Sequence, residues 1–228
     1  MAKLVFNNVG ERYFETGVKN GVLYVMGEDG QYESGVVWNG LTGVTESPSG
    51  AETTPLYADD VKYVVIYAAE EFGATIEAYT YPEEFEQCDG SAAIAEGITV
   101  GQQTRKTFAF CYKTSVGNDT QGQDLGYKIH VIYGCKAAPS EKAYATINDS
   151  PEAVTFSWEV STVPVPVEGY NPTATMVIDS TRVPAEKLAL IEEVLYGSEV
   201  EDARLPLPNE ILELIKQASP IGKKIDFL

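Results

Sequence analysis

The chain has 228 residues, and its 34 acidic against 16 basic side chains give a formal net charge of −18. A surface this acidic repels nucleic acid, which excludes binding through a general phosphate-neutralising patch. Hydrophobic residues make up 44% of the chain, as expected for a globular protein that buries a core. The three cysteines (Cys88, Cys111 and Cys135) are widely spaced and form no disulfide framework, which favours synthesis in a reducing cytoplasm.

The first ten residues contain a single short apolar run, Leu4 to Phe6. This run is too short for the hydrophobic region of a signal peptide, and no other stretch approaches the length of a membrane span. We therefore expect neither secretion nor a membrane partner.

Strand signals dominate the chain. In chain order, the predicted strands are Tyr13–Val18, Val22–Met26, Tyr32–Trp38, Val61–Tyr67, Ala74–Thr80, Lys106–Tyr112, Tyr127–Tyr133, Val154–Thr162 and Thr173–Asp179. Lys19-Asn20-Gly21 separates the first two, and Asn-Gly between such runs predicts a hairpin turn. Apolar and polar residues alternate in Val154–Thr162, which indicates an antiparallel strand with one buried face.

Helix signals are few. Tyr81–Cys88 begins with Pro and acidic residues and precedes Asp89-Gly90, so it predicts a short helix. Pro184–Tyr196 has a clear apolar face and a glycine after its end. Asn209 is placed to cap a last helix, Glu210–Gln217.

Two segments fit no regular element. Asn39 to Tyr57 (NGLTGVTESPSGAETTPLY) is rich in turn residues and predicts a long extended loop. Thr114 to Asp124 predicts a turn-rich connection between strands. We expect one domain over residues 1–228, mainly an antiparallel β-sandwich or barrel, with short flanking helices and a helical C-terminal segment from about residue 184.

No residue pattern predicts catalysis. His130 is the only histidine, and it lies in a strand with no nucleophile motif in the chain, so we expect a partly exposed structural side chain. Asn118, Asp119 and Asp124 supply oxygen atoms, but their order is not that of a calcium-binding loop. We therefore predict no enzyme activity, no metal and no cofactor.

Several ordered segments resemble a known family. They read NGLTGVTESPSGAETTPLYADDVKY, EEFGATIEAYTYPEEFEQCDGS, GQQTRKTFAFCYKT, GNDTQGQDLGYKIHVIYGC and PSEKAYATINDSPEAVTFSWEVST. Together they resemble the major tail protein, or tail tube protein, of siphophages that infect Gram-positive bacteria. The resemblance runs from about Lys3 to the RLPLP at Arg204–Pro208, and no single motif in it is a catalytic signature.

This resemblance implies a structural subunit of the virion tail, made in the host cytoplasm. Six subunits would close a ring, and rings would stack into a tube around the tape measure protein, with the tail terminator and distal tail proteins as further partners. DNA would later pass through the lumen without specific binding, because an acidic wall repels phosphates.

The resemblance also suggests roles for particular residues. The long loop Asn39–Tyr57 and the connection Thr114–Asp124 would both contact neighbouring subunits. The candidate residues are Trp38, Leu41, Val44, Pro48, Leu56, Tyr57, Asn118, Asp119 and Asp124. The lumen-facing candidates are Glu77, Glu159 and Lys128. We expect the loop to be mobile in an isolated subunit until a neighbour orders it.

Two other classes remain open at the level of sequence. A carbohydrate-binding or adhesion β-sandwich would use some of the fourteen tyrosines as stacking platforms. A β-rich hydrolase would use a pair of carboxylates, but with 34 acidic residues no pair stands out.

Overall fold

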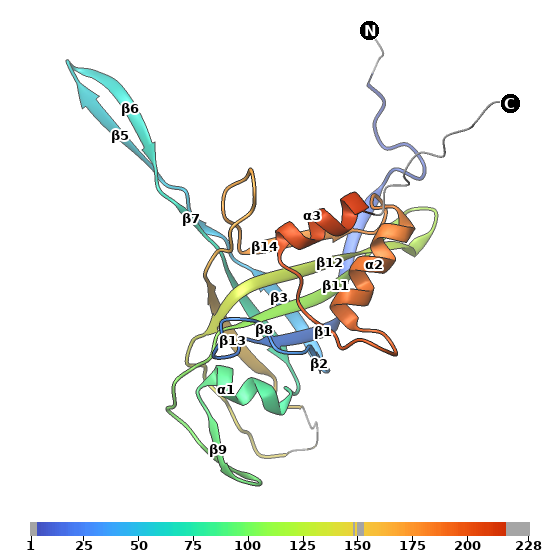
Figure 1. The fold of residues 1–228 in the computed structure, drawn as a ribbon. Helices are drawn as coiled ribbons and strands as arrows, with labels where there is room; N and C mark the ends of the chain where they lie inside the picture. The colour runs from blue at the N-terminus through green and yellow to red at the C-terminus, as the bar shows by residue number, and fades with distance from the viewer. Residues whose placement is uncertain (1–3, 148, 150–152, 218–228) are drawn as a thin grey trace, which may run out of the picture.

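The computed structural model of the protein describes residues 4–147, 149 and 153–217. The strands are β1 (Tyr13–Val25), β2 (Val36–Trp38), β3 (Leu41–Glu46), β4 (Ser49–Gly50), β5 (Thr53–Ala58), β6 (Val61–Tyr67), β7 (Glu70–Glu71), β8 (Gly73–Ala78), β9 (Ala92–Ala95), β10 (Ile98–Val100), β11 (Phe108–Asn118), β12 (Gly122–Ala137), β13 (Phe156–Thr162) and β14 (Thr175–Asp179). The helices are the 3-10 turn η1 (Glu83–Phe85), α1 (Glu86–Asp89), α2 (Ala185–Tyr196) and α3 (Pro208–Gln217). The predicted class, mainly antiparallel β with short helices, is confirmed (Figure 1).

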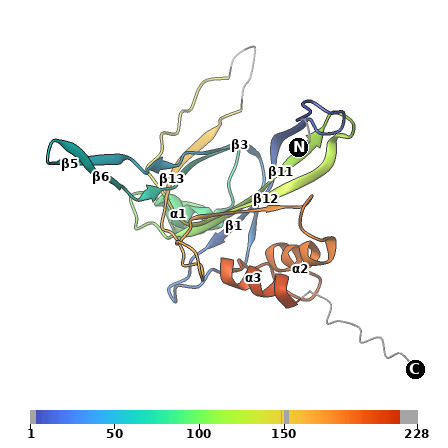
Figure 2. The ribbon, with the colours of Figure 1, turned by 90° about the horizontal axis from the view of Figure 1, so that it is seen from above.

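One large sheet organises the body. Its eight strands run in the order β2-β1-β11-β12-β13-β8-β3, and β14 adds to β12 beside β13. The sheet curls so that β3, β8 and β13 lie opposite β1, β11 and β12 across a shared core (Figure 2). The path ends at β2 and β3, so the sheet is an open sandwich and not a closed barrel.

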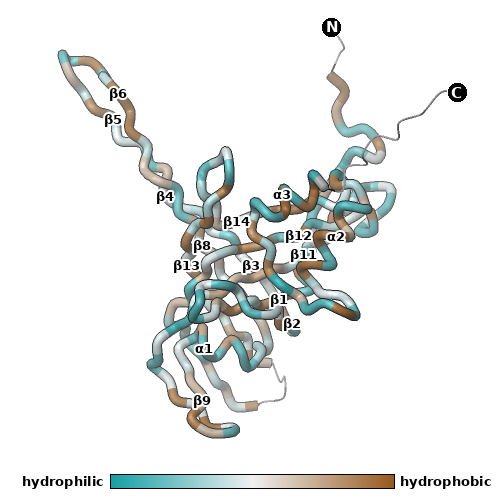
Figure 3. Tube along the Cα trace, in the orientation of Figure 1, coloured by the Kyte–Doolittle hydropathy of each residue, from teal (hydrophilic) through white to brown (hydrophobic). Residues whose placement is uncertain are grey.

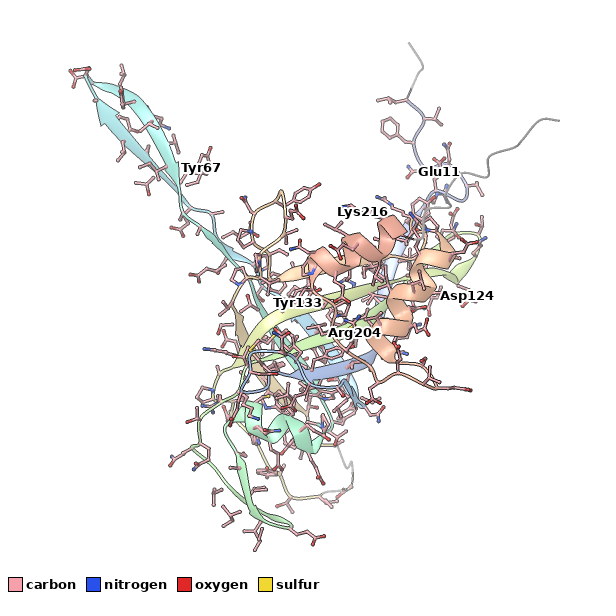
Figure 4. The ribbon with its side chains drawn as sticks, viewed as in Figure 1. Glu11, Tyr67, Asp124, Tyr133, Arg204 and Lys216 are labelled. Atoms are coloured by element: carbon pink, nitrogen blue, oxygen red, sulfur yellow. The ribbon has the colours of Figure 1, made fainter. Side chains whose placement is uncertain are left out.

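Two apolar cores lie on opposite faces of β1, β11 and β12. The inner core, between the two halves of the sheet, is rich in aromatic rings: Trp38 packs against Phe85, Phe110 and Trp158 with ring centroids 4.5 to 5.5 Å apart. The outer core lies under α2 and α3, where Tyr133 is fully buried (Figure 4). The three strands are therefore buried on both faces over much of their length, although alternation alone predicts one buried face.

The predicted hairpin turn at Lys19-Asn20-Gly21 is wrong. β1 passes straight through these residues and stays paired with β11, with register shifts on either side of Lys19. Gly17 and Asn20 have φ values of 74° and 54°, the left-handed conformation that glycine and asparagine tolerate. The Asn-Gly signal therefore marks a β-bulge in a long strand instead of a reversal.

The predicted loop at Thr114–Asp124 is wrong as well. β11 continues to Asn118 and β12 starts at Gly122, so only Asp119 to Gln121 connect them. Gly117 is packed so closely on Gly122 that an added Cβ would lie 2.1 Å from the Gly122 carbonyl oxygen. The small residues here allow the two strands to lie very close together. A loop has the same composition, so composition alone does not distinguish the two cases.

The long loop at Asn39–Tyr57 is corrected too. β3 pairs with β8 in the main sheet, and the rest of the segment forms one side of a projecting two-stranded hairpin. Its pairing partners lie in β6, β7 and β8, so no local pattern within the segment reveals them.

The remaining elements differ from prediction mainly at their ends. Of the predicted strand Tyr32–Trp38, only β2 is a strand, while Tyr32 forms an isolated bridge with Met26. The β9–β10 hairpin was not predicted from the sequence. α2 and α3 lie where the predicted helices do, and the predicted first helix is the η1–α1 turn.

Candidate assembly surfaces

The most prominent surface feature is the hairpin that projects from the body, which we call the arm (residues 49–71). β4 and β7 form its neck and β5 and β6 its outer part, and it stands clear of the rest of the molecule (Figure 1). Asp59 and Asp60 connect β5 to β6 with φ values of 50° and 61°, so positive φ at both central residues makes the tight turn. The tip is therefore acidic and its backbone conformation is well defined.

The outer arm is apolar on both faces. Leu56, Val64 and Ile66 lie on one face, and Tyr63 and Tyr67 belong to the opposite phase of the strand. These side chains are 43 to 72% exposed, and Figure 3 shows the apolar run along β6. Tyr67 points into solvent (Figure 4). Contiguous apolar patches of this kind mark interaction surfaces, and a lone two-stranded hairpin is marginally stable in water.

The candidate contact residues of the predicted loop divide between core and arm. Trp38 is 1% exposed in the inner core, and Leu41 and Val44 pack against that core. Only Leu56 and Tyr57 lie on the outer arm, and Pro48 precedes its neck. The structure therefore corrects the assignment of Trp38, Leu41 and Val44, whose apolar side chains complete the subunit's own core.

The outer surface of β3, β8 and β13 is polar. Glu77 pairs with Ser157, and Glu159 with Thr75, so both carboxylates lie on this face and are exposed. The opposite face of the same strands carries buried Ile76 and Trp158.

Lys128, the third lumen candidate, does not share that surface. It faces the open end of the sandwich interior, where its ammonium group donates to Glu15. His130 lies beside it, with Nε2 3.3 Å from Glu15 Oε1 and Nδ1 3.5 Å from Glu46 Oε1. The His130 ring stacks on Tyr112 with centroids 4.7 Å apart. This polar cluster ends the inner core and joins β3 to β1, β11 and β12.

His130 is 9% exposed, so the expectation of a partly exposed side chain is corrected. The contacts within this cluster lower the pKa values of the neighbouring acids Glu46 and Glu15. The imidazole of His130 and the hydroxyl of Tyr112 lower the pKa of Glu46, against the opposing effect of burial. Burial also raises the pKa of Glu15, but the contacts with Lys128 and Thr114 outweigh it and the net shift is downward. Both carboxylates are therefore held in their ionised form.

The β11–β12 tip binds the chain's own N-terminal segment. Asn118 Nδ2 donates to the carbonyl of Gly10 at 3.0 Å, and Asp119 Oδ1 accepts from the Gly10 amide at 3.0 Å. Asp119 also lies 3.8 Å from the Arg12 guanidinium, and Asp124 is exposed. Asn118 and Asp119 therefore hold the N-terminal segment against the β11–β12 tip. That they also contact another subunit stays a prediction.

The described part of the chain offers little support for a reactive thiol, a metal site or a membrane-spanning helix. Cys88, Cys111 and Cys135 are buried, and burial raises the pKa of Cys88 and Cys111 to about 12, so these thiols are poor nucleophiles. No group of three His, Cys, Asp or Glu residues is placed to hold a metal ion within residues 4–147, 149 and 153–217. Among the helices described, none has the length and apolar character needed to cross a bilayer.

The chain is thus an open, mainly antiparallel β-sandwich with a projecting apolar arm. No protein-family model matches it, and no curated protein does. Among solved structures, it is similar to a chain of the sheath-tube complex, in the extended state, of an extracellular contractile injection system (PVC). The TM-score is 0.31 at 12% identity, over 70% of this chain and 88% of that chain.

Proposed function

We propose that this protein is the major tail tube subunit of a phage tail, a structural virion protein without enzymatic activity or cofactor. Copies form hexameric rings that stack around a tape measure protein, between tail terminator and distal tail proteins. The finished tube gives DNA an acidic passage during ejection. The ordered sequence resemblance and the surfaces of the subunit both support this proposal.

The arm is the observation that carries the proposal. Its apolar residues on both faces are exposed in a single subunit, and β6 (VKYVVIY) has the composition of a strand buried on both faces. Such a strand needs a neighbour to cover it, and an identical copy is always present. A heterologous contact of this kind repeats from copy to copy and yields rings or filaments.

The unpaired sheet edges support the same conclusion. The main sheet ends at β2 and β3, and no other strand of the described residues pairs with their outer edges. Open edges promote association unless they are covered. Ring closure between copies would cover them.

The polar face of β3, β8 and β13 is the candidate lumen wall, with Glu77 and Glu159 as its carboxylates. Lys128 lies apart from this face and pairs with Glu15, so we leave it out of the proposed wall. Tubes of a Glu77→Lys, Glu159→Lys variant should take up short single-stranded DNA and protect it from nuclease at low salt, whereas wild-type tubes should not. Bound DNA that stays nuclease-sensitive would place these residues outside the lumen.

Negative-stain electron microscopy of the purified protein across a concentration series tests the proposal as a whole. We expect rings or tubes with a central channel. A monomer at every concentration would overturn the proposal. In that case glycan-array binding tests the alternative, a carbohydrate-binding or adhesion module that uses the exposed tyrosines.

A further inference from the structure

A groove runs between β14 and α3. Its lining is mostly apolar and includes Met176, Val177, Ile178, Ile211 and Ile215, and its volume is about 650 Å³. Val177 at its edge is 49% exposed. An apolar groove of this size on one subunit is a candidate acceptor for an apolar segment.

 The edge of β14 that borders the groove is open. β14 pairs with β12 along one edge, and no strand of the described residues pairs with the other. Residues of both faces of β14 line the groove, since Val177 and Ile178 point to opposite sides of the strand. The groove therefore follows a free strand edge and offers apolar cover to an added strand, the arrangement used in β-augmentation.

Arg182 lines the groove and places a positive charge there on an otherwise acidic protein. Lys128 also lines the groove, but its ammonium group is paired with Glu15. The Asp179 carboxylate beside them already accepts hydrogen bonds from Thr181 and pairs with Arg182 at 3.6 Å. The Arg182 side chain is 85% exposed, so its guanidinium is accessible to a further acidic partner.

We propose that the groove between β14 and α3 of one copy receives the arm of a second copy, with β6 added as a strand along the free edge of β14. This inference rests on the proposed self-assembly and names the surface that accepts the arm. This edge of β14 can accept a strand around Val177, because Thr173 Oγ1 already bonds the amide and carbonyl of Thr175 and the Asp179 carbonyl already accepts from Arg182 and Val183. The seven residues of β6 are long enough to span that stretch. The side chains on both faces of β6 are apolar, which suits a groove lined by residues from both faces of β14.

Charge sets the direction of the added strand. Asp59 and Asp60 at the arm tip precede β6, and Arg182 follows β14. The acidic tip meets Arg182 only when β6 runs antiparallel to β14. With Asp60 opposite Arg182 in an antiparallel pair, Val65 lies opposite Val177, and Val65 shares its strand phase with Tyr63 and Tyr67.

Disulfide trapping between different copies tests the inference. One copy carries Tyr63→Cys, Val65→Cys or Tyr67→Cys, and the other carries Val177→Cys; the two are mixed, assembled and oxidised. The native thiols are buried and should stay silent. A disulfide requires Cα atoms within about 7 Å, so efficient trapping in at least one pair reports strand pairing. Val37→Cys, exposed on β2, replaces Val177→Cys as the matched control and should not be trapped.

A charge test needs no cysteine. Arg182→Gln should raise the concentration needed for assembly severalfold at low salt, and the effect should shrink as salt screens the contact. In an Asp59→Asn, Asp60→Asn background the same substitution should have no further effect, because the partner charges are gone. Asparagine keeps the positive φ that the turn requires. Additive effects of the two changes would overturn the pairing of tip and groove.

The outcomes separate this inference from the proposed function. Tubes that form normally without trapping at Val177 overturn the inference and leave the tube subunit intact, whereas a permanent monomer overturns both. The groove's other possible occupants lie in the same chain, namely the segment Leu4–Val9 and residues 218–228. Val177→Cys in the monomer should react rapidly with a maleimide. Slow labelling that becomes fast in a chain lacking either segment would assign the groove to that segment and overturn the inference.

Discussion

One face of the arm can be made polar without touching the body of the subunit. Leu56, Val64 and Ile66 form that face, since Leu56 pairs directly with Val64 and Ile66 lies two residues further along β6. The variant Leu56→Thr, Val64→Thr, Ile66→Thr removes its apolar character. Threonine keeps the β-propensity of the strands, so the hairpin itself should persist.

The structure sets the size of the effect. The three side chains are 43%, 43% and 54% exposed, so about half of each remains to be buried by a partner. Full burial of such a side chain contributes roughly 1.5–3 kcal/mol, which leaves about 1 kcal/mol for each of the three. A loss of about 3 kcal/mol per arm contact lowers the association constant by roughly a hundredfold.

Sedimentation velocity over a concentration series measures this loss, and thermal unfolding of the monomer serves as the internal control. We expect assembly to shift to about hundredfold higher concentration while the monomer melts within a few degrees of wild type, because surface changes usually stay within about 0.5 kcal/mol. Val200→Thr, at a site 89% exposed outside the arm, should leave assembly unchanged. Unchanged assembly of the triple variant would refute the role of the arm. A large loss of monomer stability would show that the arm packs within its own subunit.

Three further predictions concern the body and the arm. Phe85→Ala should lower the free energy of unfolding by about 3–5 kcal/mol in urea denaturation, because Phe85 is fully buried against Trp38; a loss below about 1 kcal/mol would contradict the packing. The pKa of Glu46 is lowered in the folded state, so its charge stabilises the fold above the unfolded pKa near 4.5 and this contribution is lost as pH falls through the folded value. Wild type should therefore be more stable than Glu46→Gln at pH 7, with a gap that narrows on acidification; a gap that widens would contradict the shift. Amide hydrogens of the outer arm should exchange rapidly in the monomer and slowly in the tube, and equal rates would count against an arm ordered by its neighbour.

Local pattern was sufficient for some elements and not for others. The helices α2 and α3 were predictable because each has an apolar stripe within one continuous segment. The predicted cap Asn209 is wrong, because α3 begins at Pro208 and the Asn209 side chain accepts from the Glu168 amide. β13 was predictable because its alternation persists into the structure, with Trp158 buried and Glu159 exposed. β1 was not, because Asn20 has the same left-handed conformation in a bulge as in a turn, and only pairing with β11 decides between them.

The candidate surfaces show the same division. Sequence resemblance pointed to a contact loop, and Leu56 and Tyr57 do lie on the arm. Trp38 could not be separated from them by sequence, because an apolar side chain in a turn-rich segment serves a core and an interface equally well. The groove beside β14 has no sequence signal, since β14, Lys128 and α3 meet there only through the fold.

The sequence by itself determined the acidity of the protein, its mainly β character and the positions of its last two helices, because composition and short-range periodicity carry that information. The tertiary structure alone decided which strands are covered on both faces, which apolar strand stands exposed, and that His130 is buried between two carboxylates. These features depend on pairings between residues far apart in the chain, and a one-residue change of register reverses which side of a strand faces the core.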